Sequence, residues 1–265
     1  MGKIRLFFTA LRNLFIGFNL FSLILIFSPK KMVYVLTTIL FYFKTLSGKG
    51  RFEQKNPDEV ITSNKKYNIR IDTDCYFWGS DPSYVKDIIT LCLMVKIINA
   101  KSIFEIGTLD GYSALHFAMN SSIETKIYTL DLPPDFSEDL KLNVTSVDAL
   151  LQKKHSSIKK YRFNDTEYND KINCLFSDSA NFDYSIFFKQ IDLFFIDGAH
   201  SYEYVKSDTF NAMKCVREGG IIVWHDYGRM GVNGVTKWLC ELSNSGKKIY
   251  SVPGSSLAYH IVGLK

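Results

Sequence analysis

The sequence predicts an α/β fold, a doubly wound parallel sheet of seven strands that ends in a C-terminal antiparallel hairpin. Two observations predict this class. Short apolar runs typical of buried strands alternate with longer stretches that carry apolar residues at helical spacing. Glycine or acidic residues follow several of these runs, where a doubly wound sheet has its ligand-binding loops. An apolar N-terminal helical segment precedes the sheet.

The first half of the sheet is predicted from a helix start and two strand-like runs. Asp81-Pro82 favours a helix start, because Asp caps a helix N-terminus and Pro fits the first helical position. The apolar run over 102–106 ends in Gly107 and is typical of a buried strand. The elements expected here are a helix over 81–100, a strand over 102–106, a helix over 112–119 and a strand over 126–130.

A long polar stretch, residues 132–172, separates these elements from the second half. It carries a basic cluster, which indicates a lid over a substrate or an insertion with a solvated face, and the solvated face is favoured because charge runs usually lie in water. The elements expected after it are strands over 173–176, 191–196 and 221–224, a helix over 202–217 closed by Gly219-Gly220, a helix over 232–242, and closing strands over 248–252 and 258–263.

Charge separates an N-terminal segment, residues 1–50, from a body, residues 51–265. The whole chain has a net charge of +5, but the stretch up to Arg51 holds eight basic residues and no acidic one. The rest of the chain therefore has a net charge of −3. A mildly acidic body argues against nucleic acid as a partner.

Two apolar runs predict membrane-associated helices within residues 1–45. Residues 14–27 and 32–43 are flanked by basic residues, and each is shorter than the ~20 residues that cross a bilayer. Such runs suit a helix in the membrane interface or a re-entrant hairpin, and buried helices that cover the body are the alternative. A secretory signal is disfavoured, because Arg12 interrupts the apolar stretch and no small-residue cleavage site follows.

Cysteine usage predicts a reducing compartment. The five cysteines are widely spaced and form no Cys-x-x-Cys pair, so neither a disulfide framework nor a structural zinc site is expected. Together with the N-terminal segment, this predicts a cytoplasmic protein associated with a membrane surface.

The turn after the first strand has the features of a ligand-binding loop. Gly107 and Gly111 let the backbone turn tightly and approach a ligand, and the next helix offers free N–H groups at its start. Glu105 lies inside the strand, and the glycines do not form Gly-x-Gly-x-x-Gly. This pattern suits a cationic amino-acid group better than a pyrophosphate. Asp131 follows the second strand, where a carboxylate can accept both hydroxyls of a ribose or serve as a turn residue.

Two further segments complete an ordered set of motifs. They are IDLFFIDGAH over residues 191–200 and GGIIVWHDY over residues 219–227. With the glycine turn and Asp131, they resemble the class I S-adenosylmethionine-dependent methyltransferases. More narrowly, the chain resembles bacterial small-molecule and sugar O-methyltransferases with an Asp-Gly-x-His motif, and more distantly catechol O-methyltransferase. The likeness covers roughly residues 80–265 and implies a Rossmann-like sheet of seven strands.

The resemblance implies S-adenosylmethionine as the cofactor. The implied cofactor-binding residues are Glu105, Gly107, Gly111 and Ser113 for the methionine end, Asp131 for the ribose, and Asp178 with Ser179 beside the adenine.

The second pair of strand ends carries groups for proton transfer or metal binding. A hydroxyl must lose its proton to attack a methyl group, so the site needs a base, a metal ion or both. The resemblance implies His200 as general base, with His225 a second catalytic candidate. It also implies Asp197 and Asp226 as ligands of Mg²⁺ or another divalent ion.

His225 departs from the family pattern, because the metal-binding relatives usually carry an acidic residue there. Imidazole suits softer ions than magnesium. Three interpretations therefore remain open: a different metal, two aspartates with water, or no metal.

The predicted function is methylation of a hydroxyl on a sugar or other small metabolite. A glycan near the membrane surface is one such acceptor. Two other functions remain open: a catalytically inactive membrane-associated binding or scaffold protein on the same fold, and a nucleotide-cofactor oxidoreductase. The lack of Gly-x-Gly-x-x-Gly and the position of Glu105 inside its strand count against the oxidoreductase.

Overall fold

The computed structural model describes residues 52–61, 65–72, 82–146, 148–149, 152, 158, 160–229 and 232–264, together with residues 12, 15–17, 19, 22 and 36. The chain divides into two compact units, Met1–Gly48 and Lys49–Lys265. In the first unit the single described positions are helical. The membrane-associated helices expected over residues 1–45 otherwise lie outside the described residues. Among the described residues, no helix combines the length and apolar character needed to cross a bilayer.

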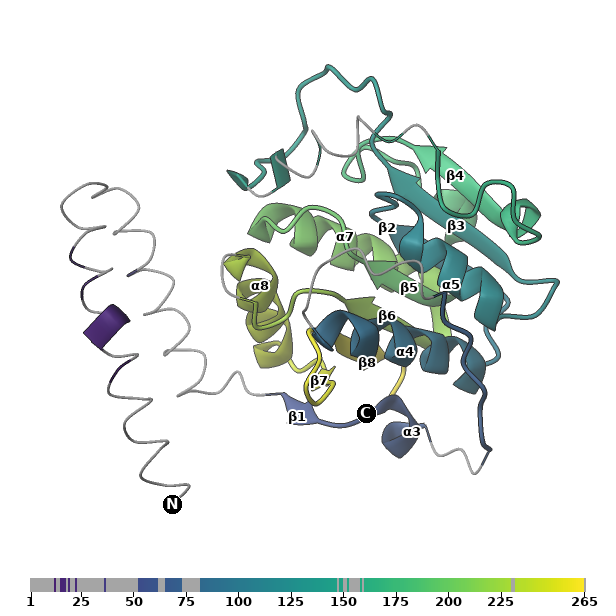
Figure 1. Cartoon of the computed structure of the whole chain (residues 1–265), viewed down its shortest axis with the longest axis horizontal. Helices are drawn as coiled ribbons and strands as arrows, with labels where there is room; N and C mark the ends of the chain where they lie inside the picture. The colour runs from purple at the N-terminus through teal and green to yellow at the C-terminus, as the bar shows by residue number, and fades with distance from the viewer. Residues whose placement is uncertain are drawn as a thin grey trace. The chain divides into compact units, whose positions relative to one another are not determined.

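The second unit is built on one mixed sheet with the strand order β1-β7-β8-β6-β5-β2-β3-β4 (Figure 1). All neighbouring strands are parallel except β8, which runs antiparallel to both β6 and β7. This confirms the predicted doubly wound sheet with a C-terminal antiparallel hairpin. The strands are β1 Glu53–Gln54, β2 Ser102–Ile106, β3 Lys126–Asp131, β4 Ile172–Phe176, β5 Ile191–Ile196, β6 Val216–Trp224, β7 Tyr250–Ser251 and β8 Ala258–Ile261.

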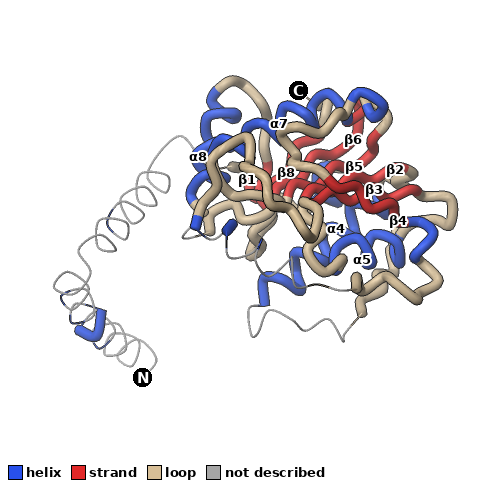
Figure 2. Tube along the Cα trace, turned by 90° about the horizontal axis from the view of Figure 1, so that it is seen from above, coloured by secondary structure: helices blue, strands red, loops and turns tan. Residues whose placement is uncertain are grey.

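Helices cover both faces of the sheet, α4 and α5 on one face and α7 and α8 on the other (Figure 2). Their side chains form two separate apolar cores. Successive strand residues point to opposite faces, so Ile103 packs in the first core and Phe104 in the second. The helices are α3 Pro57–Val60, α4 Pro82–Ile97, α5 Tyr112–Asn120, α7 Tyr202–Cys215 and α8 Asn233–Asn244, with short 3-10 turns at Asn169–Lys171 and Ser185–Phe187.

The structure differs from the sequence prediction at the sheet edge and in β6. The sheet has an eighth strand, β1, which consists of two polar residues and therefore gives no apolar signal. The predicted end of the 202–217 helix at Gly219-Gly220 is wrong. Helix α7 ends at Cys215, because Val216 is already extended and pairs with Ile191 at the start of β6. The two glycines lie inside β6, where the register with β5 shifts.

The strand order reverses between β2 and β5. The chain proceeds from β2 outward to β3 and β4, and then returns to β5 on the other side of β2. In such sheets ligands bind beyond the carboxyl ends of the strands at this reversal. The loops after β2, β3, β5 and β6 therefore define the place to look for a site.

Candidate active site

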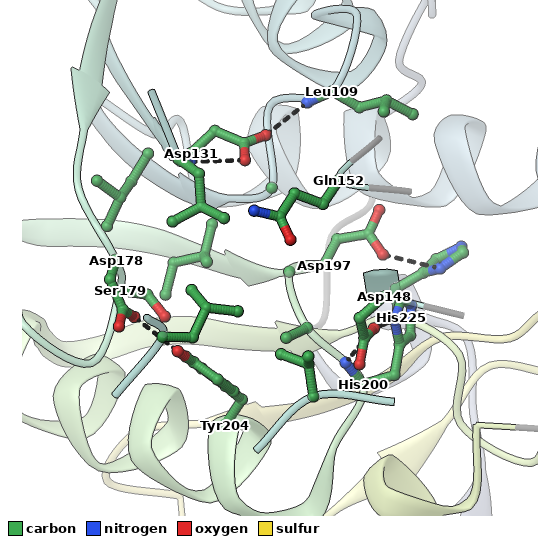
Figure 3. Close-up of a pocket in the computed structure, with 18 of the residues that line it drawn as sticks. Leu109, Asp131, Asp148, Gln152, Asp178, Ser179, Asp197, His200, Tyr204 and His225 are labelled. Atoms are coloured by element: carbon green, nitrogen blue, oxygen red, sulfur yellow. Dashed lines mark hydrogen bonds and ion pairs between the residues drawn. The ribbon is translucent and has the colours of Figure 1, made fainter. Parts of the chain in front are cut away.

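A cavity of about 430 Å³ lies at the carboxyl ends of these strands (Figure 3). It brings together most of the site residues expected from the sequence. In Figure 3, Asp178, Ser179 and Tyr204 lie at one end of the cavity and His200 and His225 at the other. The predicted residues that line it are Gly107, Asp131, Asp178, Ser179, Asp197, His200, His225 and Asp226.

The glycine turn after β2 forms one wall of the cavity by close backbone packing. Gly107 has a φ of +99°, and a Cβ built on it would lie 2.2 Å from the main-chain oxygen of Asp197. Gly111 has a φ of +81° at the start of α5, and a Cβ there would lie 2.6 Å from the Phe163 ring. No side chain fits at either position without moving the backbone or that ring, which explains both glycines.

Glu105 is fully buried beneath this turn and is not among the residues that line the cavity. Its carboxyl group accepts hydrogen bonds from the Ser113 hydroxyl and, at 2.6 Å, from the Thr129 hydroxyl. Burial raises the pKa of Glu105 to about 8, although these two hydrogen bonds oppose the rise. Ser113 and Gly111 likewise do not line the cavity. Of these three expected cofactor residues, Glu105 and Ser113 lie beneath the turn and Gly111 shapes it.

We expect the buried Glu105 to make stability depend on pH. Between pH 4.5, where the unfolded carboxyl ionises, and about pH 8, the folded protein holds a proton that the unfolded chain has released. The free energy of unfolding therefore falls as pH rises, by up to about 1.4 kcal/mol per pH unit. Glu105→Gln should make this slope shallower, because it removes the contribution of Glu105 and leaves that of other buried groups such as Asp208. Thermal melts from pH 5 to 8.5 test the prediction, with the exposed Glu124→Gln as matched control. Equal slopes in wild type and Glu105→Gln would contradict it.

Asp131 ends β3, next to the glycine turn, and is oriented by backbone groups. Its carboxylate accepts hydrogen bonds from the Leu109 N–H at 2.9 Å and the Leu132 N–H at 2.8 Å. Leu109 belongs to the glycine turn and has a φ of +46°, so Asp131 also holds that turn in place. Each carboxylate oxygen has two lone pairs, so each can accept more than one hydrogen bond.

Asp178 and Ser179 follow β4 at the other end of the cavity. Asp178 accepts hydrogen bonds from the Tyr204 hydroxyl at 2.9 Å and from the Lys141 N–H at 3.0 Å. Tyr204 comes from α7 and Lys141 from the insertion after β3. Asp178 therefore joins three separate parts of the chain around this end of the cavity.

His200 is held between two carboxylates. Its Nδ1 lies 2.6 Å from Asp148 and its Nε2 lies 2.7 Å from Asp226. Burial opposes the charged imidazolium, but hydrogen bonds and charge from both carboxylates raise the pKa of His200 to about 10. Both ring nitrogens are thus engaged, and the ring is fixed in orientation.

His225 occupies the centre of the carboxylate cluster. Its Nδ1 lies 3.1 Å from Asp197 and 3.2 Å from Asp226, and its Nε2 lies 3.1 Å from Asp87. Burial opposes the charge on this imidazole, but Asp197 and Asp226 raise the pKa of His225 well above its usual value. Burial likewise disfavours ionised Asp226, yet the two histidines lower its pKa well below the usual range. Potential ligand atoms of Asp197, His225 and Asp226 lie within 4.8 Å of one another.

Three charged residues of this cluster were not expected from the sequence. Asp87 lies on α4, Asp148 belongs to the insertion, and Arg229 places its guanidinium 3.0 Å from Asp226. Asp87 follows no strand, but it is an acidic position on the otherwise apolar face of a helix, which is the one signal that could have found it.

The insertion over residues 132–172 contributes a wall of the cavity. The sequence favoured an insertion with a solvated face, and that description does not apply to the residues that line the cavity. Asp148 is joined to Thr145 by a reciprocal pair of hydrogen bonds typical of a helix start. The same carboxylate accepts the His200 N–H at 2.9 Å. The described insertion residues that line the cavity are Leu132, Leu140, Val144, Asp148 and Gln152.

Residues 104–227 match a family described as "Methyltransferase domain". No curated protein is similar enough in sequence to count as a relative.

Among solved structures, the chain is similar to a putative O-methyltransferase from Klebsiella pneumoniae (16% identity, 70% of this chain and 83% of that one, TM-score 0.46). It is also similar to an O-methyltransferase from Bacillus cereus in complex with SAH (19%, 69% and 83%, TM-score 0.45). A third is a putative caffeoyl-CoA O-methyltransferase from Staphylococcus aureus (17%, 66% and 82%, TM-score 0.48).

Proposed function

We propose that this chain is an S-adenosylmethionine-dependent O-methyltransferase acting on a hydroxyl of a sugar or other small metabolite, a proposal supported by the match of residues 104–227 to the methyltransferase family. One observation carries the proposal. A single cavity joins a glycine turn and an aspartate, suited to the cofactor, to a cluster of carboxylates and histidines, suited to proton transfer.

The cofactor is assigned to the side of the cavity formed by the loops after β2, β3 and β4. Asp131 would accept the ribose hydroxyls, since its carboxylate is already oriented by two backbone N–H groups. Asp178 and Ser179 would lie beside the adenine. Gly107 leaves room for the methionine end, while Glu105 holds the turn in shape from below.

Bound S-adenosylmethionine would supply the methyl group: the acceptor oxygen would bond to the methyl carbon as the carbon–sulfur bond breaks, with S-adenosylhomocysteine as the leaving group. The proton of the hydroxyl passes to the enzyme. We assign its uptake to His200, whose Nδ1 is oriented by Asp148. This requires neutral His200, with its Nε2 released from Asp226. His225 lies next to the same carboxylate and would position it.

The donor set at this end also fits a divalent cation. Two carboxylates and an imidazole nitrogen converge around one point, and Asp197 is partly exposed to the cavity. We propose Asp197 and Asp226 as ligands. A bound ion would supply positive charge that stabilises the deprotonated acceptor oxygen and disfavours protonation of the neighbouring His200.

Calorimetric titration of the purified protein with S-adenosylmethionine tests the cofactor assignment. We expect wild type to bind at micromolar concentrations and Asp131→Ala to bind at least about tenfold more weakly, because hydrogen bonds to a charged group are lost. Asp135→Ala, an exposed aspartate in the next loop, is the matched control and should bind like wild type. A folded wild-type protein that does not bind S-adenosylmethionine would remove the methyltransferase proposal and leave a scaffold role.

The acceptor and the membrane association remain proposals from the sequence. The basic apolar segment within residues 1–45 motivates an acceptor at a membrane surface, such as a lipid-linked or surface glycan, on the cytoplasmic side where S-adenosylmethionine is available.

A further inference from the structure

We propose that His225 is a nitrogen ligand of the divalent ion, held in place by Asp87, and that the site prefers first-row transition ions such as Mn²⁺ or Co²⁺ to Mg²⁺. This inference deepens the metal site of the proposed function. It concerns ion binding alone, so it can fail while cofactor binding and methyl transfer stand.

The first step is the direction in which the imidazole faces. His225 Nδ1 lies 3.1 Å from the Asp197 carboxylate and 3.2 Å from the Asp226 carboxylate. The ligand atoms of the three residues lie within 4.8 Å of one another, which is a spacing that one ion can bridge. The histidine is therefore part of the donor set and not merely adjacent to two acidic ligands.

Asp87 determines which ring nitrogen carries hydrogen. Its Oδ2 lies 3.1 Å from His225 Nε2, and a carboxylate only accepts hydrogen bonds, so Nε2 carries the hydrogen. Once an ion displaces the proton from Nδ1, the Nδ1 lone pair would face the same point as the carboxylates of Asp197 and Asp226. Without an ion, a proton on Nδ1 is shared with these carboxylates, and a bound divalent ion would take its place.

Asp87 is itself fixed from the loop between β7 and β8. It accepts hydrogen bonds from the Ser256 hydroxyl at 2.7 Å, from the Ser256 N–H at 3.1 Å and from the Ser255 hydroxyl. Metal-binding histidines commonly donate their other N–H to an anchored carboxylate, which orients the ring and strengthens the nitrogen donor. The contacts from His225 to Asp87 and from Asp87 to Ser256 have this arrangement.

The charges around the site also favour a cation. Four buried or partly buried carboxylates, those of Asp87, Asp148, Asp197 and Asp226, surround the two histidines. Arg229 is the one permanently charged cation that the described residues place against this group, 3.0 Å from Asp226. An ion that binds this Asp226 oxygen shares it with the guanidinium or displaces it.

The imidazole decides the class of ion. Mg²⁺ takes oxygen ligands in a near-ideal octahedron, whereas imidazole raises affinity for Mn²⁺, Co²⁺ and the later first-row ions. An aspartate at this position would leave an all-oxygen site. The preference for ions that accept nitrogen is therefore a property of His225.

Ion titration and pulsed electron paramagnetic resonance of the metal-free full-length chain test the inference. We expect wild type to bind one Mn²⁺, to keep it in a tenfold excess of Mg²⁺, and to show magnetic coupling to a nitrogen nucleus. His225→Asp should lose that coupling, and its preference for Mn²⁺ over Mg²⁺ should fall by about tenfold or more. Asp87→Asn should keep the coupling and weaken Mn²⁺ binding by about tenfold.

His260→Gln is the matched control, because His260 is also buried but lies on β8 with its Nδ1 at 2.8 Å from the Lys248 carbonyl oxygen. It should bind Mn²⁺ like wild type. The inference is overturned if wild type binds no ion, if it binds Mn²⁺ without nitrogen coupling, or if the coupling persists in His225→Asp. If His225→Asp fails to fold, the nitrogen coupling of wild type and the Mn²⁺ affinity of Asp87→Asn still test the inference. A parallel S-adenosylmethionine titration without added ions shows separately whether the proposed function holds.

Discussion

Replacing Gly107 with alanine is expected to destabilise the body by about 3–5 kcal/mol. Two effects add. A side chain at a φ of +99° costs about 1–2 kcal/mol. The new Cβ would also lie 2.2 Å from the Asp197 main-chain oxygen, which cannot move without parting β2 from β5. The melting temperature should fall by roughly 10 °C, and cofactor binding should be lost with the shape of the turn.

Gly246→Ala separates the two effects. Gly246 has a φ of +98°, nearly that of Gly107, but nothing lies within 4 Å of a Cβ built on it. Alanine at position 246 should lower the free energy of unfolding only through its unfavourable backbone conformation, by about 1–2 kcal/mol. Thermal melts of the two variants and wild type make the comparison. Equal melting temperatures for both variants would show that the contact between the glycine turn and β5 is less tight than described.

Replacing His200 with glutamine is expected to lower kcat by about 10²–10⁴-fold, the range for loss of a general base. The affinity for S-adenosylmethionine should change little, because the ring of His200 contacts Asp148 and Asp226, and Asp178 and Ser179, assigned to the adenine, lie at the other end of the cavity (Figure 3). This split between kcat and cofactor binding distinguishes a role in proton uptake from general damage to the fold.

The measurement is the steady-state rate of methyl transfer at saturating cofactor and acceptor, beside a cofactor titration of the same preparation. His260→Gln serves here too as a buried histidine outside the cavity. If kcat of His200→Gln falls by less than about fivefold, another group takes up the proton of the acceptor hydroxyl. A variant that binds no cofactor would instead show that the contacts of His200 with Asp148 and Asp226 hold the whole site together.

The sequence predicted the sheet because its signals are local. Each buried strand is an apolar run of four to six residues, and the residues after it meet at one edge whatever the details of packing. The order of the strands along the chain is therefore enough to group Asp131, Asp197 and Asp226 at that edge. The two-residue β1 and the first residues of β6 have no such run, and they form only because β7 and β5 lie beside them.

The partners of the two histidines could not be predicted in this way. Asp87 is 138 positions from His225, and Asp148 is 52 positions from His200. Helix packing and the path of the insertion bring them together, and neither leaves a periodic pattern in the sequence. For Glu105 the sequence predicted the location but not the orientation of the side chain. Its motif places it near the cofactor, but only the packing of Ser113 and Thr129 around it reveals that it faces inward.

Asp148 has a consequence for redesign of the enzyme. The segment that forms the outer wall of the cavity also carries the carboxylate that orients His200, and it is tied down by the Lys141 N–H at Asp178. On the proposed function, the same segment would therefore serve both recognition of the acceptor and proton uptake. A graft that replaces residues 132–152 to admit a new acceptor will inherit a working catalyst only if it returns an acid to position 148 and the same anchor at 141.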